Sequence, residues 1–146
     1  MKEEQEITLI DSNILIYAHD TTEKEKYKKS IALLEECWRY NKTFAVSVQN
    51  LSEFFVVVTE KIEQPIKKKD AKEIIRRIIE FRNWIKCKPE EHSVVKAAEL
   101  CEEYNIPYWD ALIVAVMFEN KITRIYTENV KDFNKVKGLE VINPFV

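Results

Sequence analysis

Three acidic residues lie inside the three most hydrophobic stretches of the chain. Asp11 follows Ile7–Ile10, Glu53 lies within Leu51–Val58, and Asp110 stands near the start of Tyr108–Phe118. None of these acids has a lysine or arginine within four residues, although an unpartnered buried carboxylate is strongly destabilising. Carboxylates from distant parts of a chain are tolerated together when they share a divalent cation, which prefers oxygen ligands. The pattern therefore predicts an acidic metal site, with metal-assisted hydrolysis as its chemistry.

Each acid also has a purely structural interpretation. Asp11 could cap a helix that begins just after a strand, and Asp110 could be a first-turn acid favoured by the helix dipole. Glu53 could form a buried ion pair with a remote lysine or arginine. One shared site accounts for all three residues at once, and we favour it for that reason.

The segment after Thr127 offers candidates for a fourth group of the site. Glu128 and Asp132 are acids, and Asn129 is a possible neutral ligand. Asp132 precedes Phe133, whose side chain could anchor the segment in the core and direct its neighbour inward. The residues alone leave the choice among Glu128, Asn129 and Asp132 open.

Hydrophobic periodicity predicts alternating strands and helices that would position these residues. We expect strands at 7–10, 43–46, 84–87, 123–127 and 140–142, and helices at 12–17, 23–40, 47–62, 71–79, 89–104 and 108–119. The 47–62 helix is apolar on most sides, so we expect it to be buried. Asn41, Asn105 and Asn120 are predicted to end helices in the left-handed conformation. The alternation predicts an α/β domain with a parallel sheet covered on both faces, and ligands bind beyond the carboxyl ends of such strands.

Composition narrows the class of protein. The 146 residues suit one domain, 1–146, and the net charge of -2 argues against nucleic-acid binding by bulk charge alone. Three cysteines without a Cys-x-x-Cys motif disfavour disulfides and structural zinc, and fit a reducing cytoplasm. Gly138 is the single glycine, which excludes Gly-rich phosphate loops. The sequence shows no membrane-spanning stretch, and its acidic start does not look like a signal peptide.

Four segments, in order along the chain, resemble the four motifs of PIN-domain ribonucleases. They are Ile10–Leu15, Ser52–Glu53, Trp109–Ala111 and Thr127–Phe133. The likeness is greatest to the toxins of prokaryotic toxin–antitoxin pairs of the virulence-associated protein C type. The ending Asn143–Phe145 is similar to the tails of that group.

This resemblance implies a three-layer α/β/α sandwich around a short parallel sheet, and an endoribonuclease that uses Mg²⁺ or Mn²⁺. Asp11, Glu53 and Asp110 match the three central carboxylates, which are both catalytic and metal-binding residues. Asp132 matches the acid in one form of the fourth motif, whereas Asn129 stands where other members carry an aspartate. The partners implied are an RNA substrate, an antitoxin protein and a second copy of the chain.

Other functions could account for some of the same residues. A catalytically silent PIN-like module that binds RNA or protein is one alternative, and an RNA-processing nuclease without an antitoxin is another. A haloacid-dehalogenase-like phosphatase needs a second aspartate where Asn13 stands, and a receiver-type domain expects an acidic pair beside its first strand. Both are minor alternatives.

Two further features could contact RNA, and for both we favour an ordinary structural role. Trp109 could stack on a base, but we favour packing in the core. Two basic clusters could contact RNA, but we favour a solvated surface for both. One comprises Lys67, Lys68, Lys69, Lys72, Arg76 and Arg77, and the other Lys24, Lys26, Lys28 and Lys29.

Overall fold

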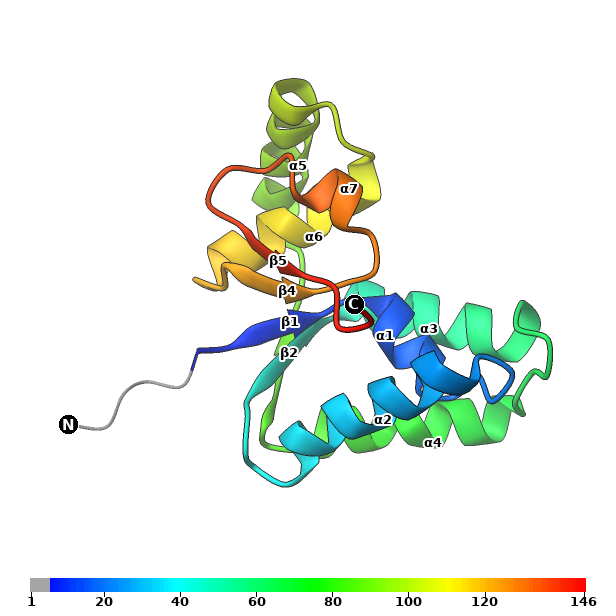
Figure 1. The fold of residues 1–146 in the computed structure, drawn as a ribbon. Coiled ribbons are helices and arrows are strands. Elements are labelled where there is room, and N and C mark those ends of the chain that lie inside the picture. The colour runs from blue at the N-terminus through cyan, green and yellow to red at the C-terminus, as the bar shows by residue number, and fades with distance from the viewer. Residues whose placement is uncertain (1–5) are drawn as a thin grey trace.

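The structure is a computed structural model that describes residues 6–146; the first five residues of the predicted domain, with the acidic start of the chain, lie outside the description. Five strands form one parallel sheet in the order β3-β2-β1-β4-β5 (Figure 1). The strands are β1 (Thr8–Ile10), β2 (Phe44–Ser47), β3 (Trp84–Cys87), β4 (Arg124–Tyr126) and β5 (Glu140–Ile142). The helices are α1 (Ser12–Tyr17), α2 (Lys24–Trp38), α3 (Val48–Glu60), α4 (Lys68–Glu80), α5 (Glu91–Tyr104), α6 (Tyr108–Glu119) and α7 (Val130–Phe133).

The sheet separates two helical layers, with α1 to α4 on one face and α5 to α7 on the other (Figure 1). Side chains alternate along each strand, because successive residues of a strand point to opposite faces. Leu9 packs in the core beside α5 and α6, whereas Ile10 packs in the core beneath α1 to α4. The three-layer α/β/α sandwich predicted from the sequence is confirmed.

Helix α3 differs from its prediction. Ser47 caps it as expected for that residue type, accepting a hydrogen bond from the backbone N–H of Asn50 at 3.2 Å. Only one face, which includes Phe54 and Val58, is buried. Val48 and Val56 on the other face are 48% and 41% exposed, so the expectation of a buried helix was wrong. The short sheet and α1 cover one side of α3, and its remaining apolar residues find no core to enter.

Two of the three predicted helix ends are displaced by one residue. Asn105 takes the left-handed conformation with a φ of 54°, as predicted. At the other two ends Tyr40 and Lys121 have positive φ, at 62° and 59°, in place of Asn41 and Asn120. The polarity of the asparagines located the turns but did not identify the residue that takes the strained conformation.

The sheet order creates a crevice at the carboxyl ends of β1 and β4. The chain leaves β1 toward β2 on one side and later returns as β4 on the other, the arrangement at which open α/β sheets bind ligands. Ile10 pairs with Tyr126 at the ends of these strands, so Asp11 and Thr127 follow as neighbours. Within residues 6–146, no helix combines the length and apolar character needed to cross a bilayer.

Candidate active site

Asp11 lies where β1 ends and is the N-cap of α1. One carboxylate oxygen accepts a hydrogen bond from the backbone N–H of Ser12 at 2.8 Å. The other accepts from the Thr127 hydroxyl at 2.7 Å and from the Asn13 amide at 3.2 Å. Burial raises the pKa of Asp11, and the Thr127 hydrogen bond is the largest of the effects that oppose it. Asp11 therefore caps the helix, as the structural interpretation proposed, and also presents a buried acid at the crevice.

Glu53 is joined to Asp11 through a serine. The Ser12 hydroxyl donates to Glu53 Oε2 at 2.8 Å and also lies 3.5 Å from Asp11 Oδ1. The sequence predicted a buried Glu53, but the residue lies on the exposed face of α3. That prediction failed because the apolar neighbours of Glu53 are divided between the two faces of the helix. The buried ion pair considered for Glu53 is wrong for the same reason.

Asp110 occupies the first turn of α6 and is half-buried. Burial raises its pKa, and the negative charges of Asp11, Asp132 and Glu53 raise it further, to about 6. A hydrogen bond from the Asn129 amide to Asp110 Oδ2, at 3.1 Å, opposes this shift. The structure thus brings the four predicted acids close enough to influence one another, although they come from four separate segments.

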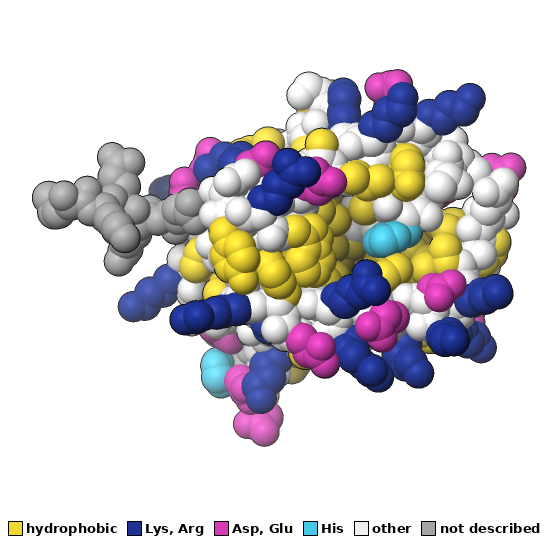
Figure 2. Space-filling model, turned by 90° about the horizontal axis from the view of Figure 1, so that it is seen from below, with side chains coloured by type: hydrophobic (Ala, Val, Ile, Leu, Met, Phe, Trp, Pro, Cys, Tyr) yellow, Lys and Arg dark blue, Asp and Glu magenta, His cyan; other side chains and the backbone are white. Residues whose placement is uncertain are grey.

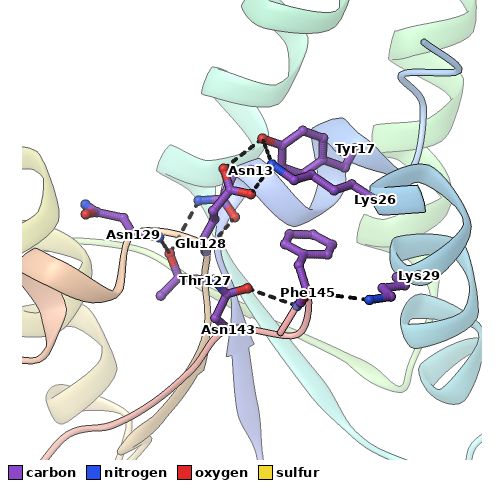
Figure 3. A network of polar contacts seen from close by, with 9 residues as sticks. All are labelled: Asn13, Tyr17, Lys26, Lys29, Thr127, Glu128, Asn129, Asn143 and Phe145. Atoms are coloured by element: carbon purple, nitrogen blue, oxygen red, sulfur yellow. Dashed lines mark hydrogen bonds and ion pairs between the residues drawn. The ribbon is translucent and has the colours of Figure 1, made fainter. Parts of the chain in front are cut away.

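The three candidates for the fourth group, Glu128, Asn129 and Asp132, have different partners in the structure. Glu128 turns toward α1 and α2, where Tyr17 Oη donates to it at 2.8 Å and Lys26 Nζ lies 2.7 Å away (Figure 3). The Asn129 amide donates to both Asp110 and Asp132, the latter at 3.2 Å. Glu128 is therefore bound by residues outside the acidic cluster, whereas Asn129 and Asp132 lie beside Asp110.

Asp132 is the most peripheral of the four acids. It lies in α7 and also forms an ion pair with Lys135 at 3.8 Å. The next residue, Phe133, is fully buried, as expected of an anchor for this segment. Asp132 influences the site through its charge on Asp110 and through the shared Asn129 amide.

A groove of about 600 Å³ opens over three of these acids. Its acidic part contains Asp11, Glu53 and Asp110, with Asn129 beside them. Its apolar lining comes from Ile16, Val56, Val57, Trp109 and Ile113, and Lys61 is the basic residue in the lining. A ligand of this groove would meet acids, apolar walls and one cation within a short distance.

The acids fit a hard divalent cation in chemical type. Among residues 6–146 no lysine, arginine or histidine forms an ion pair with Asp11, Glu53 or Asp110, so their charge is not neutralised by the protein. Carboxylate oxygens are preferred ligands of Mg²⁺. In this described part of the chain, however, no three acidic, histidine or cysteine side chains are placed to hold an ion directly. The arrangement suits a cation that keeps several waters, as Mg²⁺ does.

Sequence reasoning missed two parts of the site. Asn50 is buried, and its amide lies 3.4 Å from Asp11 Oδ1, but as a residue in the first turn of a helix it gave no distinctive signal. Trp109 was expected in the core and is instead 65% exposed at the rim of the groove. This expectation was wrong because Tyr108, the neighbouring residue of the same turn, packs against the core, and Trp109 lies on the exposed side.

Comparison with known proteins decides the family. The sequence pattern of the PIN domain matches residues 8–139. The chain belongs to the PIN domain family. No curated protein matches this PIN domain at a significant level.

Solved structures share the fold of this PIN domain. A chain of a toxin–antitoxin complex from Klebsiella pneumoniae superposes with a TM-score of 0.66 at 21% identity, covering 94% of this chain and 97% of that one. A chain of VapBC2 from Rickettsia felis, bound to a promoter DNA fragment, gives 0.64 at 20% identity, covering 94% and 98%. The Mycobacterium tuberculosis toxin VapC20, described as cleaving the sarcin–ricin loop, gives 0.65 at 13% identity, covering 86% and 91%.

Proposed function

We propose that this PIN domain is an endoribonuclease that depends on Mg²⁺ or Mn²⁺ and is the toxin of a toxin–antitoxin pair. The observation that carries the proposal is the gathering of Asp11, Glu53 and Asp110 in one groove, where none of them has an ion-pair partner among residues 6–146. Burial and the charges of the neighbouring acids raise the pKa of Asp110 to about 6, in keeping with this crowding. Such a concentration of unneutralised charge in a groove is typical of a functional site. Its place beyond the ends of adjacent parallel strands gives further support.

We assign the acids distinct roles. Asp11 and Asp110 hold the cation, and Glu53 and Asp132 contribute directly or through water. A bound Mg²⁺ or Mn²⁺ would lower the pKa of an attacking water and offset charge on the leaving oxygen of a phosphodiester. Hydrolysis adds this water to phosphorus and breaks the bond from phosphorus to the leaving oxygen.

The surrounding polar residues hold the acids in place. The Thr127 hydroxyl and the Ser12 backbone N–H fix the two oxygens of Asp11. The Ser12 hydroxyl orients Glu53, and the Asn129 amide orients Asp110 and Asp132 together. Because these partners are neutral donors, they position the carboxylates without cancelling the charge that attracts a cation.

The assignment to a toxin is supported by the structural neighbours and by the apolar surface. One structural neighbour is a chain of a toxin–antitoxin complex, and another is a toxin. Figure 2 shows a band of hydrophobic side chains across the face that carries α2 and α4, with lysine and arginine side chains along its edges. A separate apolar hollow of about 620 Å³ includes Val48, Val56 and Ile79, each at least 41% exposed. We propose that an antitoxin and a second copy of the chain cover such surfaces, and that the protein acts in the cytoplasm.

A catalytically silent RNA-binding module remains the competing proposal. It is favoured by the observation that, in residues 6–146, no three potential ligands are placed to hold an ion directly. The two proposals differ in whether the acids are needed for chemistry.

The test is RNA cleavage by the purified protein, free of any partner, in Mg²⁺, in Mn²⁺ and in chelator. Asp11→Asn and Asp110→Asn keep the size of the side chains but remove a charge and replace one acceptor oxygen by an NH2 donor. Asp70→Asn, at an exposed position in α4, is the matched control. We expect metal-dependent cleavage by wild type and Asp70→Asn, and none by the two folded site variants. Equal cleavage by all four proteins would point to a contaminant, and RNA binding without cleavage would favour the silent module.

A further inference from the structure

Trp109 is far more exposed than the apolar residues that follow it in α6. Its side chain is 65% exposed, whereas Ala111–Met117 of the same helix are all buried. Burial of an indole is among the largest apolar contributions available to a protein. Because Trp109 lines the groove together with other apolar residues, it belongs to a surface that a ligand of the groove would cover.

The surroundings hold Trp109 at the edge of the groove. The Gln49 side-chain amide donates to its backbone carbonyl at 3.1 Å, tying the start of α6 to α3. The ring of Tyr108 lies edge-on, with centroids 5.1 Å apart and planes at 72°. Ile113, one helical turn further on, continues the same lining into the groove. The backbone at Trp109 is thus tied to α3, the indole has one ring contact with Tyr108, and most of its surface is open to solvent.

The groove combines features that suit a nucleotide. Asp110 is the neighbour of Trp109 in sequence and belongs to the acidic part of the lining. Val56 and Val57 add apolar surface, and Lys61 provides a positive charge for a phosphate. A nucleic-acid strand presents charged phosphates and flat, apolar base faces at regular intervals, so both kinds of lining would be used at once.

We propose that Trp109 is a stacking platform for a base of the strand whose phosphate lies at the acids. This inference rests on the proposed function, because it assumes that the groove receives RNA. Stacking on an aromatic ring tolerates any base, since every base has a π face. Trp109 would therefore contribute affinity and would select for unpaired nucleotides, because a base inside a duplex cannot turn onto the indole.

The test uses Asp11→Asn, which should not cleave, as the background for binding. A short single-stranded RNA is titrated while tryptophan fluorescence is recorded. Trp84 is buried and Trp38 is half-buried, so a fluorescent response from a ring in contact with solvent is expected to come from Trp109. W109F retains an aromatic face, W109L retains only apolar bulk, and W38F is the matched control. A probe of the same length that lacks bases, with only the sugar–phosphate chain, separates stacking from phosphate binding.

We expect RNA to quench the fluorescence of the background protein and of W38F, but not that of W109F or W109L. By the usual contribution of one stacked base, W109L should bind RNA about five- to one hundred-fold more weakly. W109F should lie much closer to wild type. The probe without bases should bind W109L and the background protein equally. Iodide should quench Trp109 in the free protein and lose access when RNA is bound.

Several results would overturn the proposal. One is equal RNA affinity of W109L and the background protein, and another is a fluorescence response that persists in W109L. Protection of Trp109 from iodide in the free protein would show that a second copy covers the ring instead. Failure of the two proposals can be told apart. If wild type cleaves RNA with metal but W109L binds RNA as the background protein does, only the stacking proposal is wrong. If RNA quenches Trp109 and W109L weakens binding, but wild type does not cleave RNA, only the nuclease proposal is wrong. If the background protein does not bind RNA and the wild-type protein with Mn²⁺ does not cleave it, both fail.

Discussion

The hydroxyl of Thr127, at the end of β4, donates a 2.7 Å hydrogen bond to a carboxylate oxygen of Asp11, at the end of β1. Both side chains are buried, and the contact joins neighbouring strands whose residues are far apart in sequence. It is the largest of the interactions that lower the pKa of Asp11 against the effect of burial. The hydroxyl therefore favours the ionised form of the acid that we assign to the cation.

Replacement of Thr127 by valine should weaken metal binding, because valine has nearly the same shape but lacks the hydroxyl. The pKa of Asp11 should rise, metal should bind more weakly at neutral pH, and the free energy of unfolding should fall by about 1–3 kcal/mol, because a buried acceptor loses a donor. Thr127→Ser keeps the hydroxyl and should retain most of the metal affinity. Calorimetric titration with Mn²⁺ and denaturant unfolding measure the two effects. Equal metal affinity in the valine and serine variants would contradict this account.

The contact between Lys26 and Glu128 leads to a second prediction. Tyr17 and Lys26 hold Glu128 at 2.8 Å and 2.7 Å (Figure 3). The amide of the adjoining Asn129 donates to Asp110 at 3.1 Å. The ring of Phe145 packs edge-on against Tyr17, with centroids 5.3 Å apart, so the end of the chain supports the same contact. We expect Lys26→Met or Glu128→Gln to lower RNA cleavage several-fold by loosening the segment that carries Asn129.

The stability of these two variants should change by only about 1 kcal/mol or less, because both side chains are partly exposed. Lys28→Met, on the exposed surface of the same helix, is the control for loss of one positive charge. The exchanged pair Lys26→Glu with Glu128→Lys should recover part of the lost activity. If the exchanged double variant cleaves RNA no faster than the slower of the two single variants, the ion pair does not position the segment that carries Asn129.

Asp110 should make the metal-free protein less stable as the pH rises. Its folded-state pKa of about 6 is above the ordinary value of 3.8, so the folded protein binds this proton more tightly than the unfolded chain does. Relative to an uncharged residue, Asp110 costs no stability below pH 4, where it is protonated in both states. The penalty grows between pH 4 and 6 and is at its full size above pH 6. Asp110→Asn should therefore stabilise the metal-free protein at pH 7 by roughly 1–2 kcal/mol, after allowance for partial exposure.

This gain should disappear at pH 4, where wild-type Asp110 is itself mostly neutral. Asp70→Asn, at an exposed site, should show no such pH dependence. Denaturant unfolding in chelator at the two pH values measures the difference. A constant effect of Asp110→Asn across this range would show that Asp110 is not held among like charges.

Asn129 provides a test of how its neutral amide affects the pKa of Asp110 and the affinity for metal. Its amide lowers the pKa of Asp110, so both Asn129→Leu and Asn129→Asp should raise that pKa further. Only Asn129→Asp adds a charged ligand, and only that variant should bind Mn²⁺ more tightly. NMR titration of the carboxyl carbons gives the pKa, and metal titration gives the affinity. Tighter binding by Asn129→Leu would mean that the amide competes with the cation instead of orienting the acids.

Much of the fold and part of the site could be predicted from the sequence. Strand and helix positions follow from hydrophobic periodicity, and Asp11 was predicted correctly at a strand end because buried strands end where polarity begins. Exposure of Glu53 and Trp109 could not be predicted, since it depends on which face of α3 and of α6 packs against the rest of the protein. An apolar neighbourhood in sequence is divided over all faces of a helix, so it does not decide burial for any one residue.

The fourth group of the site also needed the structure. Glu128 and Asn129 are adjacent in sequence, and their directions are set by partners from other elements. Glu128 meets Tyr17 and Lys26 from α1 and α2, whereas Asn129 meets Asp110 from α6. Such long-range pairing leaves no local pattern that sequence reasoning could use.

The most direct test of the central claim measures metal binding and RNA cleavage on the same samples. Bound Mn²⁺ is counted by electron paramagnetic resonance while the initial cleavage rate is recorded at each Mn²⁺ concentration. We predict that both rise together in wild type and Asp70→Asn, and that both are lost in Asp11→Asn and Asp110→Asn, which remain folded. Full Mn²⁺ binding or metal-dependent cleavage in folded Asp11→Asn and Asp110→Asn would contradict the proposal that these acids hold the catalytic cation.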